Sequence, residues 1–193
     1  MHEHDLLLTR RSAIAAALAV TAAPTLFGDV AHASPPAAPH DFDFLVGHWN
    51  VRHRRLTAHF VGSTSWEEFT GTTASTSVLG GTGNVADNVF NRSTGIVRGL
   101  GISAMDISSG EWFSWWLNGG SLPSIDPPLR GRFFQGVGTF AGNDTLDGKP
   151  IRVRVQWSKI TKNAFRWEQA YSADEGNTWE VNTTGDFRRA TVR

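Results

Sequence analysis

Residues 151–157 read Ile-Arg-Val-Arg-Val-Gln-Trp, a strict alternation of apolar and polar side chains. A period of two puts the apolar side chains on one face of a β-strand and both arginines on the other. One face of the strand therefore lies in a core and the other is exposed to water. In a barrel the wet face is either outside or lines a polar cavity, and the alternation alone leaves both possibilities open.

The same alternation continues in residues 164–171, where Phe165, Trp167, Gln169 and Tyr171 share one face. Further segments of strand character are bounded by Gly, Asn, Asp or Pro. They comprise a strand opening at residues 47–49 and the segments 58–70, 72–80, 85–91, 96–106, 111–117, 131–140, 150–160, 164–172 and 179–188. About ten short strands with regular turns predict an all-β fold, either a meander, a sandwich or a barrel. Residues 41–46 are expected to form one helical turn capped by Asp41.

The composition excludes several classes of function. The chain has 193 residues, with 18 Lys and Arg against 18 Asp and Glu, and no Cys. A balanced charge gives no support to nucleic-acid binding. The lack of Cys excludes disulfides, thiol catalysis and Cys-ligated metals. The 8 Trp, 12 Phe and 20 Gly are typical of strands and turns.

The first 33 residues are expected to be a cleaved export signal rather than part of the fold. Arg10-Arg11 precedes an apolar run over residues 13–23, and Ala31-His32-Ala33 is a small-x-small cleavage site. The paired arginines indicate twin-arginine export, and an ordinary secretory signal is the alternative. Residues 34–40 are then a linker and residues 41–190 the single domain. The mature protein is expected to be periplasmic or secreted, with no membrane insertion.

Gly47-x-Trp49 at the start of the first strand, with Arg188-Arg189 after the last, resembles the lipocalin and wider calycin signature. The resemblance implies that Trp49 closes the barrel floor under an arginine from the end of the chain, here assigned to Arg188. A guanidinium over an indole contributes roughly 1–2 kcal/mol when it is sheltered from water. These residues are therefore expected to be structural.

Residues 172–179, Ser-Ala-Asp-Glu-Gly-Asn-Thr-Trp, match the Asp-box pattern of sialidase blades. The pattern folds a hairpin in which Asp174 bonds turn amides, Gly176 takes a positive φ and Trp179 packs under the turn. A single copy does not make a propeller. We therefore expect the hairpin and not the sialidase fold.

A longer set of motifs over residues 41–190 resembles a bacterial family of uncharacterised calycin-like β-barrel proteins. The motifs are residues 41–51, Trp66-x-x-Phe69, residues 79–84, Trp112-Phe-x-x-Trp116, residues 131–140, residues 166–169 and the 172–179 turn. The resemblance implies a single antiparallel calycin-like barrel. Related barrels imply a small interior cavity for a hydrophobic or aromatic ligand, and no particular reaction.

His53 is the candidate catalytic residue, because it shares the strand face of Trp49 and could look into a barrel. A hydrogen-bonded wall residue is the plainer interpretation. Haem-binding barrels of the nitrobindin type use a His late in the chain, and this chain has none after His59. We expect no metal and no cofactor, with haem held by His53 or His59 as the remaining alternative.

The first functional hypothesis is a binding protein. Trp66, Trp112 and Trp116 would stack a flat ligand, and Arg98 or Arg154 would meet its acidic or carbonyl end together with His53. Barrel packing for the tryptophans and a solvated outer face for the arginines are the plainer interpretations.

The second hypothesis is a cofactor-independent isomerase, cyclase or lyase in the same pocket. His53 would be the general acid or base, and an arginine would stabilise an enolate.

Overall fold

The computed structural model describes residues 40–121 and 125–191. The predicted export signal over residues 1–33 and all but the last residue of the predicted linker lie outside this part. Two short 3-10 turns and ten strands follow one another along the chain. They are η1 (Asp43–Leu45), β1 (Gly47–Leu56), β2 (Trp66–Val78), η2 (Leu79–Gly81), β3 (Gly83–Arg92), β4 (Gly95–Asp106), β5 (Glu111–Asn118), β6 (Leu129–Phe134), β7 (Val137–Leu146), β8 (Lys149–Ser158), β9 (Ala164–Ser172) and β10 (Glu180–Arg189).

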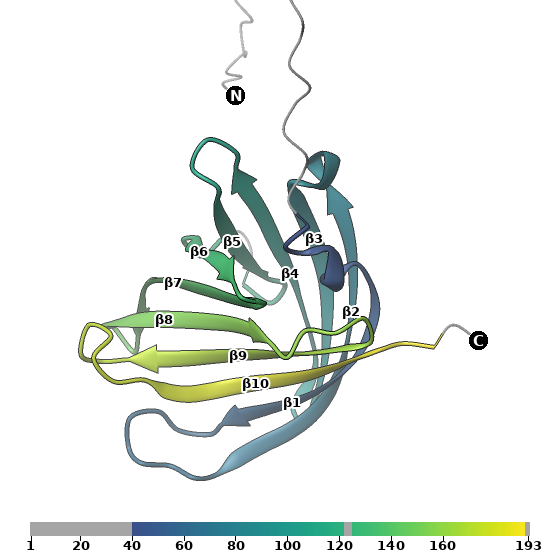
Figure 1. Cartoon of the computed structure of the whole chain (residues 1–193). Coiled ribbons are helices and arrows are strands. Elements are labelled where there is room, and N and C mark those ends of the chain that lie inside the picture. Colours follow the sequence, from purple (N-terminus) through teal and green to yellow (C-terminus); the bar gives the residue numbers. More distant parts are fainter. Residues whose placement is uncertain (1–39, 122–124, 192–193) are drawn as a thin grey trace, which may run out of the picture. The chain divides into compact units, whose positions relative to one another are not determined.

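The strands form a closed antiparallel barrel (Figure 1). Each strand pairs with its neighbour in sequence, and β1 pairs with both β2 and β10, which closes the sheet. Up-and-down order needs only short connections, and closure leaves no free sheet edge. The all-β class and the antiparallel barrel of about ten strands are confirmed.

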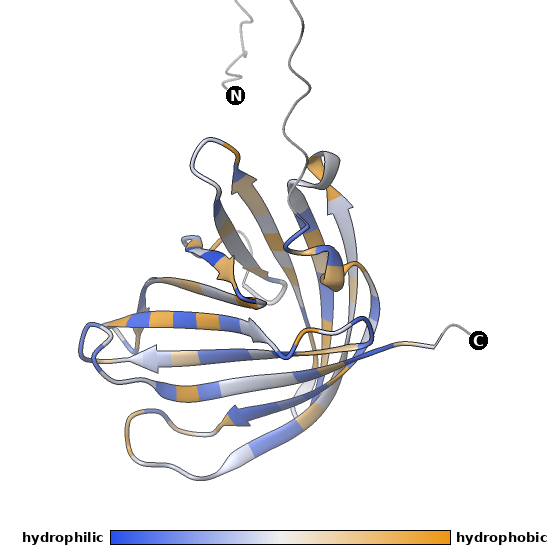
Figure 2. Cartoon of the chain, viewed as in Figure 1, coloured by the Kyte–Doolittle hydropathy of each residue, from blue (hydrophilic) through white to orange (hydrophobic). Residues whose placement is uncertain are grey.

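The alternating segment that predicted the fold is β8. Ile151, Val153, Val155 and Trp157 are buried, and Arg152 is exposed. Figure 2 shows the resulting alternation of hydrophobic and hydrophilic bands along this strand. The apolar face looks into the barrel, and the arginine face looks out.

Two strand boundaries were predicted wrongly, and the two errors cancel in the count. Residues 58–70 and 72–80 were predicted as two strands, but residues 66–78 form the single strand β2. Gly71 lies inside this strand and does not end it. A Cβ there would lie 2.5 Å from the Val89 carbonyl oxygen and 3.1 Å from His53 Nε2, so no larger side chain fits. Glycine at this position is a packing requirement rather than a turn signal.

The segment 131–140 was predicted as one strand and is instead the β6–β7 hairpin. Its turn is Gln135-Gly136, with φ of 49° and 76°. Positive φ at both central residues is typical of the tight hairpin turn that matches strand twist.

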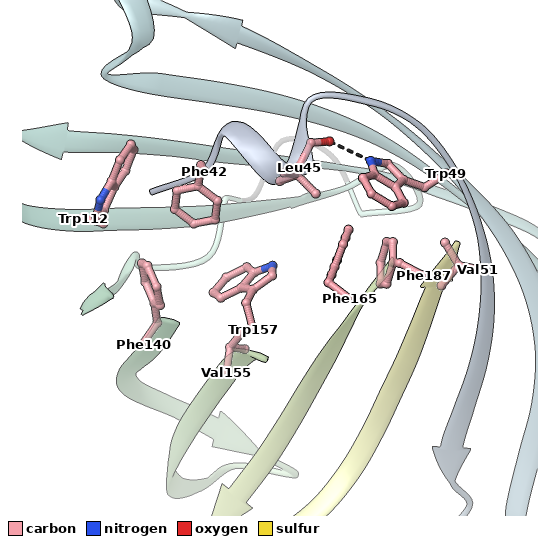
Figure 3. Close-up of a cluster of buried hydrophobic side chains, with 10 residues drawn as sticks. All are labelled: Phe42, Leu45, Trp49, Val51, Trp112, Phe140, Val155, Trp157, Phe165 and Phe187. Atoms are coloured by element: carbon pink, nitrogen blue, oxygen red, sulfur yellow. Dashed lines mark hydrogen bonds between the residues drawn. The ribbon is translucent and has the colours of Figure 1, made fainter. Parts of the chain in front are cut away.

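One end of the barrel is closed by η1 and an aromatic cluster (Figure 3). The Phe42 ring makes T-shaped contacts with Trp112 and Trp157, with centroids 4.8 and 5.3 Å apart. Trp49 Nε1 donates to the Leu45 carbonyl over 2.7 Å, which ties η1 to β1. The buried members are Phe42, Leu45, Trp49, Val51, Trp112, Phe140, Val155, Trp157, Phe165 and Phe187. We call this set the floor cluster.

Asp41 does not cap η1, contrary to the prediction. Phe42 occupies the cap position and makes no side-chain capping bond. Asp41 Oδ2 instead accepts a hydrogen bond from Trp112 Nε1 over 3.0 Å. The carboxylate thus partners a buried indole that would otherwise leave its N–H unpaired.

Arg189, and not Arg188, stacks on Trp49. The guanidinium carbon of Arg189 lies 4.2 Å from the indole centroid. The same side chain donates to the carbonyls of Lys162, Val46 and Phe44. Gly47, with φ of 116°, gives it room, since a Cβ there would lie 2.7 Å from Arg189 Nη1. Arg188 is exposed, because the strand alternation turns it outward.

The 172–179 turn has the expected geometry. Asp174 accepts hydrogen bonds from the hydroxyl and the amide N–H of Thr178, and these lower the pKa of Asp174 to about 2. Gly176 has φ of 99°, and Trp179 Nε1 donates to its carbonyl over 2.9 Å. No helix within residues 40–121 and 125–191 is long and apolar enough to cross a membrane.

The Arg189 contacts predict a stability difference between two adjacent arginines. Arg189→Ala removes a cation–π contact and three hydrogen bonds to carbonyls, so we expect a loss of about 2–3 kcal/mol in the free energy of unfolding. Arg188→Ala should change it by less than about 0.5 kcal/mol. Urea unfolding of both variants measures the difference, and equal losses would contradict the assignment.

Candidate ligand-binding cavity

The barrel encloses a cavity of about 560 Å³ to which all ten strands contribute side chains. Leu45, Val155, Trp157 and Phe187 belong both to the cavity wall and to the floor cluster. The floor cluster therefore forms the bottom of the cavity. A volume of this size is within the range of small-molecule sites.

The charged residues of the wall lie at the end of the barrel opposite η1, which we call the mouth. Arg55 is next to the end of β1 and Arg92 is the last residue of β3. Asp126 precedes β6, and Asp144 lies near the end of β7. Because β1 starts directly after η1, these positions gather at the far end.

Aromatic side chains make the apolar part of the wall between floor and mouth. Phe90 and Trp116 meet at 6.0 Å between centroids, with their planes 64° apart. The other Phe, Trp and Tyr side chains that line the cavity are Phe69, Trp115, Trp157, Trp167, Tyr171 and Phe187. Such rings present large flat faces on which a planar ligand can stack.

His53 sits in this aromatic wall with 5% of its surface exposed. Its ring stacks on Phe69 at 5.1 Å and lies 5.0 Å from Phe90 and 6.2 Å from Phe187. Burial lowers the pKa of His53 from 6.5 to about 4, against a smaller raising effect of the Thr184 backbone. The imidazole is therefore neutral at physiological pH.

Two glycines make room for the His53 ring. A Cβ at Gly71 would lie 3.1 Å from Nε2, and a Cβ at Gly185 would lie 3.2 Å from Nδ1. Both glycines are on the strands that flank β1: Gly185 pairs with His53, and Gly71 lies two residues beyond Phe69, which pairs with His53 on the other side. The His53 ring thus lies between two glycines, which have no side chains to displace it.

Polar residues of the wall are partly bonded to one another. Thr73 Oγ1 donates to Asn88 Oδ1 over 2.7 Å, and Asn88 Nδ2 donates to the Ala86 carbonyl over 2.9 Å. Ser103 Oγ donates to Ser114 Oγ over 3.3 Å. This network holds one side of the cavity in a single arrangement.

Other wall atoms within the described residues have no hydrogen-bond partner. They are His53 Nδ1, Asn84 Nδ2, Asn182 Nδ2 and, nearer the mouth, His59 Nδ1. Asn84 and Asn182 are 2% and 1% exposed. A buried polar atom without a partner costs about 1–3 kcal/mol, so each such atom needs an explanation.

The mouth combines both signs of charge. The pKa of Asp126 is raised by burial and by repulsion from Asp144. The pKa of Tyr171 is raised by burial and by Asp144, and Arg55 opposes this. His59 Nδ1 lies 3.7 Å from Glu180 Oε1. Within residues 40–121 and 125–191, no group of three or more His, Asp and Glu side chains is placed to hold a metal ion.

Comparison with known proteins supports the fold and nothing more specific. No family model matches the chain, and no curated protein matches it. Among solved structures, it is similar to the S-type phycobiliprotein lyase of Guillardia theta, with 11% identity and a TM-score of 0.50. The match covers 79% of this chain and 92% of that protein. The chain therefore has a calycin-like, lipocalin-like barrel fold.

The structure brings two of the six predicted site residues to the cavity wall, His53 and Trp116. Trp112 shares the inward face of β5 with Trp116 but lies four residues nearer the closed end, inside the floor cluster. It is 1% exposed and packs under Phe42. Its role in the structure is packing.

Trp66, Arg98 and Arg154 are not among the residues that line the cavity. Arg54 lies over the Trp66 ring at 4.9 Å, and Arg154 lies over Trp179 at 4.5 Å. Arg98 is exposed on β4. Strand alternation turns all three away from the cavity, with Arg98 exposed and Arg154 half-buried against Trp179.

Several wall residues were not predicted as ligand contacts. Trp167 and Gln169 share the β9 face that the alternation already identified, so that signal was present in the sequence. Phe69 and Phe90 could have been found only from the pairing of their strands with β1 and β2. Asn182 lies at a register shift between Val181 and Thr183 that no sequence motif marks.

The buried His53 predicts a specific pH dependence of stability. The unfolded chain takes up a proton near pH 6.5 and the folded chain only near pH 4, so stability is complete above 6.5 and falls between 6.5 and about 4. This group should contribute about 3 kcal/mol of that fall. Urea unfolding of the wild type and His53→Gln from pH 4 to 7 isolates it. Parallel curves for the two proteins would contradict the burial of a neutral imidazole.

Proposed function

We propose that the barrel binds a small hydrophobic or aromatic molecule in its interior. The observation that carries the proposal is a cavity of about 560 Å³ with aromatic walls above a closed floor. A guest that buries about 150–250 Å² of apolar surface, as an aromatic side chain does, gains about 4–6 kcal/mol. That gain corresponds to dissociation constants from about 1 mM to tens of micromolar before any hydrogen bond is added.

The solved neighbour supports the proposal only through the fold. Its name shows that a barrel of this kind can belong to a lyase, here one of phycobiliproteins. Its identity of 11% carries neither that substrate nor that activity to this chain. Binding is common to a carrier and to a lyase, and it is therefore the part that we propose.

Catalysis by His53 is less well supported than binding. A general acid at neutral pH must hold a proton, and a general base is most effective when its pKa is near the working pH. Burial lowers the pKa of His53 to about 4, so at pH 7 it carries no extra proton and is a weak base. Arg98 and Arg154, the arginines named for an enolate, lie on the outer face.

We also propose that the chain is exported and belongs to the bacterial calycin-like family that its motifs resemble. The support is the sequence of residues 9–33, with its paired arginines, apolar run and small-x-small site, and the motif set over residues 41–190. The proposed partner is the small ligand alone, with no nucleic acid and no cofactor.

A pair of substitutions at Gly101 tests the binding proposal. Gly101 lines the cavity, and a Cβ there would lie 3.8 Å from Ala86 Cβ and 3.9 Å from Asn88 Nδ2, which is ordinary contact. Gly101→Phe should therefore fill the cavity without forcing the backbone. We expect it to weaken binding of the neutral probe N-phenyl-1-naphthylamine at least about tenfold, a change of about 1.4 kcal/mol.

Gly101→Ala is the matched control and should keep the binding. In the wild type and the control, the probe should quench Trp fluorescence and raise the melting temperature. The proposal fails if Gly101→Phe, folded as judged by circular dichroism, binds the probe as well as Gly101→Ala does.

Export is tested by replacing both Arg10 and Arg11 with Lys. Twin-arginine export predicts that the periplasmic or secreted protein begins at Ser34 and that the double variant stays in the cytoplasm. The intact mass of each fraction gives the answer. Unchanged export of the variant would instead indicate an ordinary secretory signal.

A further inference from the structure

We propose that Trp116 limits the width of the ligand and that Gly99 is the residue that positions the Trp116 ring. Gly99 lets this ring lie on the β4 backbone instead of in the cavity. The inference rests on the proposed interior binding and names what the cavity selects, which is a flat aromatic molecule of limited width. Three observations carry it: the space at Gly99, the strand register around it, and the contacts that surround the Trp116 ring.

The Trp116 ring occupies the place that a side chain at residue 99 would take. A Cβ at Gly99 would overlap Trp116 Cζ2, and it would lie 2.6 Å from Cη2 and 3.0 Å from the Leu117 carbonyl oxygen. Glycine inside a strand weakens it, and often marks a place where another group approaches the backbone closely. Here that group is the six-membered ring of the indole, and Gly99 is buried beneath it.

The register between β4 and β5 shows that the Trp116 ring leans towards the mouth. Trp116 pairs with Gly101, whereas Gly99, two residues nearer the mouth on β4, pairs with Asn118. The ring nevertheless lies over Gly99 and not over its own pairing partner. Gly101 is therefore left uncovered and lines the cavity, and Gly99 is not among the described residues that line it.

The Trp116 ring has little room to move except into the cavity. The β4 backbone lies on one side of it, and Phe90 packs against it at 6.0 Å between centroids. Phe90 contacts His53 and Phe69 in turn, at 5.0 and 6.3 Å. Protein interiors are densely packed, so a displaced ring must move into space that is empty. That space is the cavity, whose wall already includes Trp116.

The part of the wall beside Trp116 is made of small side chains. Ala86 pairs with Gly101 across β3 and β4, and Ser103 pairs with Ser114 across β4 and β5. All four line the cavity. A wall of small residues leaves the available width to be set by the large side chain at its edge, which is Trp116. A flat fused-ring molecule can occupy this space up to that width.

Two neutral ketones of different width test the inference. They are 2-acetylnaphthalene and the wider 1-acetylpyrene, and titration of the full chain followed by Trp fluorescence gives both dissociation constants. Gly99→Ala should push the Trp116 ring into the cavity. We expect it to weaken binding of acetylpyrene at least about tenfold and binding of acetylnaphthalene less than about threefold. The affinity ratio of the two probes then falls, which a general loss of stability would not cause.

A second substitution locates the effect at Trp116. Leu at position 116 is too short to reach Gly99, so Gly99→Ala in a Trp116→Leu background should leave the affinity ratio of Trp116→Leu unchanged. Trp116→Leu alone should favour acetylpyrene relative to the wild type, because it removes the group that limits the width. Gly101→Ala is the matched control. A Cβ there would make only ordinary contacts with Ala86 and Asn88, so the ratio should stay within about twofold of the wild type.

The outcomes separate this inference from the proposed function. If Gly99→Ala folds, as judged by circular dichroism, and keeps the wild-type ratio, the inference is overturned while interior binding stands. The same holds if the ratio falls equally far in the Trp116→Leu background, because the cause is then a change in β4. If Gly99→Ala does not fold, Trp116→Leu alone decides: a ratio shifted towards acetylpyrene supports the inference, and an unchanged ratio overturns it. If neither probe binds the wild type, interior binding itself is contradicted and this inference falls with it.

Discussion

The width of the barrel is the constraint from which the rest of the structure follows. A closed barrel of about eight strands is just wide enough for its own side chains to fill. This barrel has ten strands, so its interior side chains close one end and leave the other open. The chain places most of its buried aromatic residues at the η1 end, where they pack edge to face.

The hydrogen bonds of two side chains, Trp49 and Arg189, stabilise that closed end. Trp49 donates to the Leu45 carbonyl from inside, and Arg189 covers the same indole and donates to three carbonyls of neighbouring segments. Hydrogen bonds from a charged donor contribute more than neutral ones. The floor can therefore be rigid without the cavity above it being filled, and a preformed cavity reduces the ordering that a ligand must impose.

The sequence predicted the fold through alternation, which is a local property. The faces of β8 and β9 could be assigned correctly because each side chain alternates with its neighbours irrespective of the rest of the chain. The position of a residue along the barrel axis, between floor and mouth, could not be assigned in the same way. Trp112 and Trp116 share one face of β5, yet one is in the floor and the other is in the wall. Only the pairing of β5 with β4 and β6, together with the position of η1, separates them.

Other residues depended on contacts that no sequence pattern encodes. The choice between Arg188 and Arg189 is decided by one step of strand register and by the missing Cβ of Gly47. Gly71 looks like a turn signal and is instead the space in which the His53 ring lies. Asn182 owes its position to a shift in register. These local departures from regular pattern are where a fold is expected to accommodate function.

The wall contains buried polar atoms that have no hydrogen-bond partner among the described residues. Unpartnered amides at Asn84 and Asn182 and a neutral imidazole at His53 all weaken the empty protein, and apolar residues of similar size would avoid that cost. Such a loss of stability is common at binding sites.

A crystal structure of the protein soaked with 2-acetylnaphthalene tests the central claim most directly. The account predicts ligand density inside the barrel, above the floor cluster, with the naphthalene ring against Trp116. Side chains collapsed into that space, or density only on the outer surface, would contradict it.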